Sequence, residues 1–260
     1  MAGVVFYEGP SAIDGKPIVA IATTGTRNKK TGPLVQTWIL RADVSPVNAI
    51  NTGADSSVCG SCPLRGIIAN STRVKRKKVN RFRSCYVRVG RAPNQIWKAY
   101  RRGVYPTLDA LSPAMRRALR NSLLRRGSYG DPVAVPRAAW DALAELVKPG
   151  KHPGYTHQWD SPAAAGWQTD LMASVQTLDE RARAVAAGWR TFRIVKSVDE
   201  LQDGEILCPA SPEAGSTKTC EQCGACNGRR DSRDLRHSVA IPGHGSRFAV
   251  LPSLLRLLDN

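Results

Sequence analysis

Met172-Ala173-Ser174-Val175 is followed by a helical segment, Leu178 to Ala187, and then by Thr191-Phe192-Arg193-Ile194-Val195. A β-rich run, a helical run and a second β-rich run therefore follow one another within a short stretch. The same alternation continues through the rest of the chain after Asn121. Further β-rich segments lie at Leu123–Leu124, Tyr155–Trp159, Ile206–Leu207 and Val239–Ile241, and helical ones at Arg137–Val147 and Ala163–Thr169. Repeated βα units predict an α/β protein with a mostly parallel sheet, arranged as a partial or complete βα barrel.

The N-terminal part of the chain has a different pattern. Two apolar runs, Pro17–Ile21 and Thr37–Leu40, flank a polar turn at residues 28–33, which predicts a β-hairpin. We assign residues 1–45 to this hairpin extension and residues 46–260 to the barrel-like domain. Helices are expected from Ala92 to Arg102 and from Ser112-Pro113 to Arg120, where Ser112 would cap the helix and Pro113 would occupy its first turn.

The composition is strongly basic. Lys and Arg total 38 against 21 Asp and Glu, and the net charge of +17 favours polyanionic partners, nucleic acid first among them. A GC-rich genome that encodes many arginines is the alternative explanation of this charge. No apolar run is long enough to span a bilayer, and the N-terminal residues lack the pattern of a secretory signal. We therefore expect a cytoplasmic protein that does not contact membranes, and the sequence leaves its oligomeric state open.

The basic residues are densest between Cys62 and Cys85. Seven of the eleven residues from position 73 to 83 are basic, with too few apolar positions for a buried element. This segment is expected to be an exposed loop that binds nucleic acid through Arg73, Lys75, Arg76, Lys77, Lys78, Arg81 and Arg83.

Seven cysteines fall into two groups, and in a reducing compartment this pattern favours metal ligation over disulfides. The first group, Cys59, Cys62 and Cys85, offers three thiolates. Three ligands leave one coordination position open, as a catalytic zinc or a substrate-binding iron–sulfur cluster requires. A fourth, distant ligand that completes a structural zinc site is the competing interpretation.

The second group, Cys208, Cys220, Cys223 and Cys226, has enough thiolates for one closed centre. Its C-x2-C-x2-C spacing is typical of loops around a four-iron cluster, although four-thiolate zinc stays open as an alternative. His237 or His244 could replace one thiolate. We expect this group to be structural or an auxiliary electron relay.

Polar residues in successive predicted strands indicate a polar pocket. His157, Asp131, Ser174 and Arg193 are the candidate catalytic residues, and Gln176 follows Ser174. A glycine-rich turn at Gly127, Ser128, Gly130, Asp131 and Pro132 follows a predicted strand, where the backbone could approach a ligand closely. In barrels of this kind the chemistry lies at the carboxyl ends of the strands. No phosphate-binding loop, dinucleotide fingerprint or nucleophile elbow occurs, which argues against nucleotide hydrolases and serine hydrolases.

The chain resembles the phage and plasmid proteins named for "gene product 88". The resemblance runs from about Asn48 to Gly245. It rests on the C-x-x-C-P motif, Cys85-Tyr86-Val87, Arg126–Pro132, Tyr155–Trp159, Met172–Val175, Cys208–Ser211 and the triple-cysteine loop. This resemblance implies that the expected cytoplasmic location is the cytoplasm of the phage host.

That pattern is in turn similar to radical S-adenosylmethionine enzymes, which are partial βα barrels. The similarity implies that Cys59, Cys62 and Cys85 hold a [4Fe–4S] cluster and that residues 127–132 bind S-adenosylmethionine. The four later cysteines would match an auxiliary cluster. In those enzymes the three cysteines lie closer together, whereas here the basic segment separates Cys62 from Cys85.

Three functions follow from these features. The first is radical chemistry on a nucleic acid or nucleotide, for example base modification. The second is a zinc-bearing barrel similar to tRNA-guanine transglycosylases, in which Asp160, Asp131 or Asp203 would act as nucleophile or base. The third is a non-catalytic nucleic-acid-binding protein with structural metal.

Overall fold

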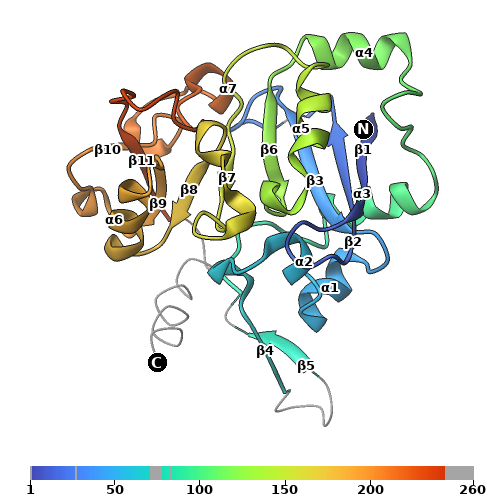
Figure 1. Cartoon of the computed structure of the whole chain (residues 1–260), viewed down its shortest axis with the longest axis horizontal. Coiled ribbons are helices and arrows are strands. Elements are labelled where there is room, and N and C mark those ends of the chain that lie inside the picture. The colour runs from blue at the N-terminus through green and yellow to red at the C-terminus, as the bar shows by residue number, and fades with distance from the viewer. Residues whose placement is uncertain (1, 27, 71–77, 82, 244–260) are drawn as a thin grey trace.

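The computed structural model describes residues 2–26, 28–70, 78–81 and 83–243. Within these ranges the chain forms a mixed α/β fold with two larger sheets placed edge to edge (Figure 1). A separate two-stranded ribbon, β4 (Ile67–Asn70) with β5 (Lys78–Arg81), projects from the body below them.

The first sheet has the order β1-β2-β3-β6 and contains β1 (Gly3–Pro10), β2 (Pro17–Thr23), β3 (Val35–Arg41) and β6 (Leu124–Tyr129). The expected hairpin is confirmed, because β2 and β3 pair antiparallel with Ala20 opposite Ile39. The pattern missed β1, which adds to the outer edge of β2. β3 also pairs in parallel with β6, so residues 1–45 share a sheet and a core with later parts of the chain.

The second sheet is parallel throughout, in the order β10-β11-β9-β8-β7. Its strands are β7 (Tyr155–Thr156), β8 (Met172–Val175), β9 (Thr191–Val195), β10 (Glu205–Leu207) and β11 (Ser238–Pro242). A single parallel bridge between Arg126 and Gly154 connects β6 to the start of β7. The described strands thus form no closed barrel, although the parallel βα organisation expected from the sequence is present.

Helices cover these sheets, and their starts follow local sequence signals. The longer helices are α1 (Pro46–Thr52), α3 (Ala92–Arg101), α4 (Pro113–Arg120), α5 (Arg137–Ala144) and α6 (Leu178–Ala186). Ser112 caps α4 by accepting a hydrogen bond from the Met115 backbone N–H, as expected. The predicted helix over residues 163–169 is wrong: two short 3₁₀ turns, η3 (Pro162–Ala164) and η4 (Trp167–Thr169), take its place. Gly166, at φ 78° between them, interrupts a continuous helix.

The remaining elements are short and lie around the site. They are α2 (Ser56–Cys59), η1 (Pro63–Arg65), η2 (Pro132–Ala134), η5 (Val198–Glu200), η6 (Pro212–Ala214) and α7 (Cys220–Cys223). The main core joins both sheets, with Ile39 and Leu124 from the first and Ala173 from the second in one cluster. A smaller core around Met172, Val239 and Ile241 contains Cys208 and Cys226. The second cysteine group is therefore built into the packing of the parallel sheet.

Candidate functional site

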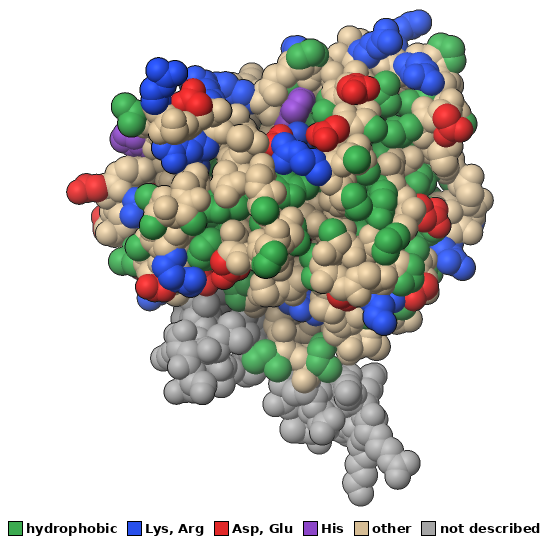
Figure 2. All heavy atoms as spheres, viewed as in Figure 1, with side chains coloured by type: hydrophobic (Ala, Val, Ile, Leu, Met, Phe, Trp, Pro, Cys, Tyr) green, Lys and Arg blue, Asp and Glu red, His purple; other side chains and the backbone are tan. Residues whose placement is uncertain are grey.

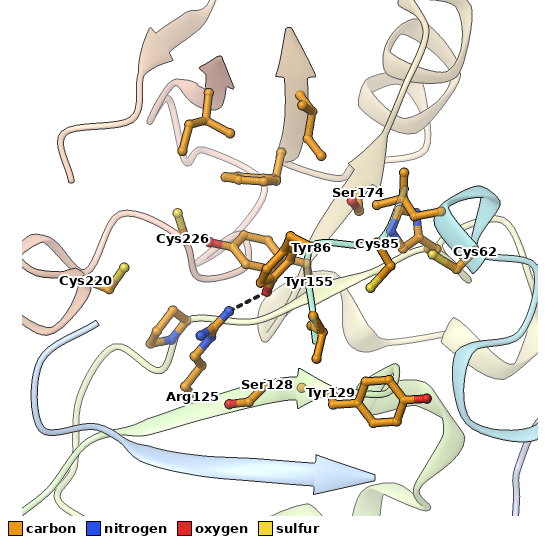
Figure 3. Close-up of a pocket in the computed structure, with 18 of the residues that line it drawn as sticks. Cys62, Cys85, Tyr86, Arg125, Ser128, Tyr129, Tyr155, Ser174, Cys220 and Cys226 are labelled. Atoms are coloured by element: carbon orange, nitrogen blue, oxygen red, sulfur yellow. Dashed lines mark hydrogen bonds between the residues drawn. The ribbon is translucent and has the colours of Figure 1, made fainter. Parts of the chain in front are cut away.

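One cavity of about 530 Å³ lies against the inner faces of β6, β7, β8, β9 and β11. All seven cysteines line it. Figure 3 shows Cys62 and Cys85 on one side, Cys220 and Cys226 on the other, and Tyr86 and Tyr155 between them. Its size is in the usual range for small-molecule sites. The two sequence groups are thus parts of one site, although more than a hundred residues separate them in the chain.

The first cysteine group comes from two loops that backbone hydrogen bonds hold together. Cys59 ends α2, and the Cys62 N–H donates to the Cys59 carbonyl at 3.1 Å, which closes a tight turn. Cys85 lies beyond β5 and returns to this turn because its N–H donates to the Leu64 carbonyl at 3.0 Å. The long separation between Cys62 and Cys85 is bridged in this way, and strands β4 and β5 lie between them in the chain.

Gln158 anchors the Cys59–Cys62 turn from the opposite side. Its side-chain N–H donates to the Cys59 carbonyl at 3.2 Å, and its Oε1 accepts from the backbone and hydroxyl of Ser61 at 3.2 Å each. A Cβ at Gly60 would lie 2.2 Å from Gln158 Oε1, so only glycine leaves room for this amide. The requirement for glycine in the C-G-S-C motif is a packing one.

Charged groups surround the same turn. Arg65 donates to the Gly60 carbonyl at 2.8 Å and to Asp55 Oδ1 at 2.7 Å, and Asp55 is almost completely buried. The Arg83 guanidinium lies 3.7 Å from the other oxygen of Asp55. The buried negative charge of the Asp55 carboxylate, beneath the first cysteine group, is therefore compensated by two arginines, Arg65 and Arg83.

Three polar groups beside the first cysteine group have no hydrogen-bond partner among the residues that the structure describes. Ser84 Oγ, the Tyr129 hydroxyl and Arg83 Nη2 are buried without a hydrogen bond, and all three residues line the cavity. Ser84 is 8% exposed and Tyr129 is 4% exposed. Unsatisfied buried donors are costly, and at a cavity wall they indicate the position of a polar ligand.

The second cysteine group is held mainly through its backbone. The N–H groups of Cys220 and Glu221 donate to the carbonyls of Lys30 and Thr31 at 3.0 and 3.1 Å, and the Cys208 N–H donates to Ala240 at 2.8 Å. Arg190 donates to three carbonyls, those of Ala225, Asn227 and His237. The Tyr155 hydroxyl lies beside the Cys226 sulfur (Figure 3). This group is thus closely packed by other segments, and α7 presents two of its cysteines from one turn.

In the absence of a bound cation, burial disfavours the thiolate form of the cysteines in both groups. Burial, and after it the proximity of the neighbouring thiols, raises the pKa of Cys59 and Cys62 well above the ordinary value. Burial likewise raises the pKa of Cys226 to about 12. A metal centre replaces these protons and removes the mutual repulsion of the thiolates. Among the described residues, no group of three or more His, Cys, Asp or Glu side chains is arranged to hold a single metal ion.

The glycine-rich segment lines the cavity at Gly127, Ser128, Gly130 and Asp131, whereas Pro132 is buried behind it. Packing of the chain itself is a reason for its glycines that the sequence did not reveal. Gly127 and Gly130 have φ of 73° and 83°, and a Cβ at Gly130 would lie 2.6 Å from the Cβ of Ile39. Neighbouring chain, rather than a ligand, occupies the space that the two missing side chains leave.

Asp131 fastens this segment to the next strand. Its carboxylate accepts hydrogen bonds from the Val133 N–H, from the Thr156 hydroxyl at 2.8 Å and from the His157 N–H at 2.8 Å. Burial raises the pKa of Asp131 to about 6 in spite of these bonds. Because its oxygens already have partners, Asp131 is a positioning residue in this structure.

Two of the remaining candidate catalytic residues reach the cavity and one does not. His157 and Ser174 line it, and burial lowers the pKa of His157 to about 4. The expectation that Arg193 lines the pocket is wrong. On β9, Phe192 and Ile194 face the cavity, and Arg193 points to the opposite side of the sheet. There it pairs with Glu205 at 2.6 Å. Gln176 is buried outside the cavity lining.

The basic segment also differs from the expected exposed loop. Lys78 and Arg81 belong to strand β5, while Arg73, Lys75, Arg76 and Lys77 lie outside the described residues. Arg83 is half-buried in the cavity wall beside Asp55, so its role is internal. On the face shown in Figure 2, Lys and Arg side chains are scattered, with Asp and Glu among them.

The acidic residues of the transglycosylase-like alternative do not converge. Asp160 and Asp203 are exposed and do not line the cavity, so only Asp131 is near the cysteines. His237 is exposed and its described contact is through its backbone carbonyl, while His244 lies outside the described residues. Neither histidine is placed at a cysteine group among the residues that the structure describes.

Sequence reasoning missed Gln158, Arg65, Arg125 and Tyr86 as parts of the site. Arg125 projects into the cavity from β6 and donates to the Tyr86 hydroxyl at 2.8 Å (Figure 3). Tyr86 directly follows Cys85, and Arg65 lies three residues after Cys62. For Tyr86 and Arg65, the available signal was therefore their closeness in the sequence to the cysteine motif.

Comparison with protein-family models, with curated proteins and with solved structures finds no match to this chain. No helix among the described residues is long and apolar enough to cross a membrane.

Proposed function

We propose that this protein is an iron–sulfur enzyme similar to the radical S-adenosylmethionine enzymes and that it acts on a nucleic acid or a nucleotide. The observation that carries the proposal is the convergence of three thiols and four thiols on one cavity. A purely structural metal site needs four ligands and no cavity. Base modification in a phage of the "gene product 88" type is the use that we propose for this chemistry.

The arrangement of the strands supports a partial barrel around the cavity. β3 and β6 are parallel, the Arg126–Gly154 bridge continues this direction to β7, and β7, β8, β9 and β11 are parallel in turn. Ser174 lies opposite Phe192, and Ile194 lies opposite Ile241, so the cavity-facing side chains form rows on one side of the sheet. We propose that this curved row of parallel strands is the open barrel expected from the sequence.

The number and type of the thiols in each group, rather than their present geometry, favour two iron–sulfur clusters. Cys59, Cys62 and Cys85 would hold a cluster with one iron open to the cavity, and Cys208, Cys220, Cys223 and Cys226 would hold a second, fully ligated one. When bound, the first cluster and S-adenosylmethionine supply the electron transfer and carbon–sulfur cleavage of radical chemistry. Zinc at either set is the alternative that metal analysis must test.

The chain's own side chains would then bind and orient the ligands. Arg83, Ser84 and Tyr129 offer unpartnered hydrogen-bonding groups next to the three-cysteine set. His157 and Ser174 lie further along the wall, where the low pKa of the histidine keeps it neutral near pH 7. The apolar side chains of Phe192, Ile194 and Ile241 reduce the access of water to the same space.

Metal and sulfide analysis of the full chain, purified without oxygen, tests the proposal. Two clusters predict about eight iron and eight sulfide per chain and absorbance at about 400 nm. Replacing Cys59, Cys62 and Cys85 together by serine should remove about half of the iron and abolish cleavage of S-adenosylmethionine. The matched variant with serine at Cys208, Cys220, Cys223 and Cys226 should lose the other half. Colourless protein that contains zinc would refute the iron–sulfur assignment.

A further inference from the structure

The cavity has a second polar region, on the side away from the first cysteine group. Arg125 extends into it from β6, and its guanidinium binds the Tyr86 hydroxyl (Figure 3). Lys30 lines the same cavity from the loop before β3. Cys220 lines the cavity together with Arg125 and Lys30. This region is therefore next to the second cysteine group.

Arg125 has no acidic partner among the described residues. No carboxylate forms an ion pair with it there, and the groups that act on its charge are Tyr86, Tyr155 and Cys220. Asp131 is the single acidic residue in the described lining, and its oxygens already accept hydrogen bonds. A guanidinium in a cavity wall without a counter-charge is suited to an anionic oxygen group, which it can bind through two parallel N–H bonds.

Aromatic side chains lie beside this cation. Tyr155 and Phe192 pack as a tilted pair with ring centroids 4.3 Å apart and an interplanar angle of 38°, and both line the cavity. Tyr86 is 64% exposed and contributes a further ring next to Arg125. Planar bases stack on such rings with little dependence on sequence. A cavity of about 530 Å³ is too small to admit a duplex.

We propose that Arg125, with Tyr86 and Lys30, binds the phosphate of a single nucleotide unit whose base packs against Tyr155 and Phe192. The inference rests on the proposed function in that it names the substrate class for the same cavity. It places the substrate next to the second cysteine group and leaves the unpartnered groups at the first one for the cofactor. The binding step itself requires no iron.

Titration calorimetry on the full chain, purified without oxygen, tests this assignment. The probes are the four nucleoside 5′-monophosphates, the corresponding nucleosides, inorganic phosphate and phenylacetate as an aromatic carboxylate. At least one monophosphate should bind, and Arg125→Gln should weaken it about tenfold or more while leaving the nucleoside unaffected. Tyr86→Phe keeps the ring and should weaken binding less. The matched control is Arg117→Gln, which removes an exposed arginine on α4.

Several results would overturn the inference. Equal loss of affinity in Arg117→Gln would show that only net charge matters. Unchanged affinity in Arg125→Gln together with loss of iron would show that Arg125 serves the cysteine group instead. Binding of phenylacetate, without binding of any monophosphate, would show that the ligand is a carboxylate and not a nucleotide. If the protein contains no iron but Arg125 still binds a monophosphate, the inference stands and the proposed function fails.

Discussion

The two cysteine groups differ in how the fold holds them. The first is anchored by side chains, since Gln158 and Arg65 bind the turn that carries Cys59 and Cys62, and unpartnered donors remain next to it. The second is anchored by its own backbone against residues 30 and 31, Ala240 and Arg190. The difference supports our proposal that the cofactor binds next to the first group, whereas the second group lines the cavity and also belongs to the packing of the parallel sheet.

Removal of Arg190 should produce the largest effect and should act on the second group. Its guanidinium is 5% exposed and binds three backbone carbonyls around Cys226. Arg190→Gln leaves these carbonyls without donors and should lower the free energy of unfolding by about 3 kcal/mol. Denaturant titration gives this number, and iron analysis should show loss from the second group. If Arg117→Gln, the exposed control, costs as much, our account of Arg190 is wrong.

A methyl group at Gly60 should disturb the first group by a smaller amount. Gly60→Ala forces the buried Gln158 amide away from Ser61 and the Cys59 carbonyl, and it adds strain at φ 54°. We expect a loss of about 2 kcal/mol in the free energy of unfolding. Gly215→Ala is the control for a positive φ, because Gly215 has φ 61° and no atom within 4 Å of the point that a Cβ would occupy. Its ψ of 19° is left-handed helical, whereas Gly60 has ψ −132°, so the control accounts for part of the strain at Gly60. Equal losses in both variants would show that strain alone is responsible.

Acid should weaken the wall between the two groups, and its effect per residue is the smallest of the three. Burial lowers the pKa of His152 and of His157 to about 4 from an ordinary value of 6.5. The unfolded chain therefore binds these protons first, so stability is full above about pH 6.5 and falls as the pH drops toward 4. We expect about 1 to 2 kcal/mol per histidine at about pH 5.

Denaturant titrations at about pH 7 and pH 5 measure this effect. The difference between the two pH values should shrink when His152 and His157 are both changed to Asn. His237→Asn, at an exposed position, should leave it unchanged. An unaltered pH difference in the double variant would contradict the assignment.

Local patterns in the sequence predicted much of the fold. The β2–β3 hairpin, the capped helix after Ser112 and strands β8, β9 and β11 follow from apolar spacing and turn residues close by. The prediction was wrong at residues 163–169, where Gly166 adopts a left-handed conformation. It was also wrong for Arg193, because a strand of uncertain register does not reveal which face a polar residue occupies.

For the candidate site, the sequence by itself determined which thiols are present and how they are grouped. Spacing within a turn is local, so C-x-x-C motifs can be interpreted without a structure. Only the tertiary structure decided that both groups line one cavity, that Arg83 faces inward and that Arg125 has no counter-charge there. These relations depend on strand pairing between distant segments. The direction in which a side chain points after such pairing cannot be inferred from local sequence patterns.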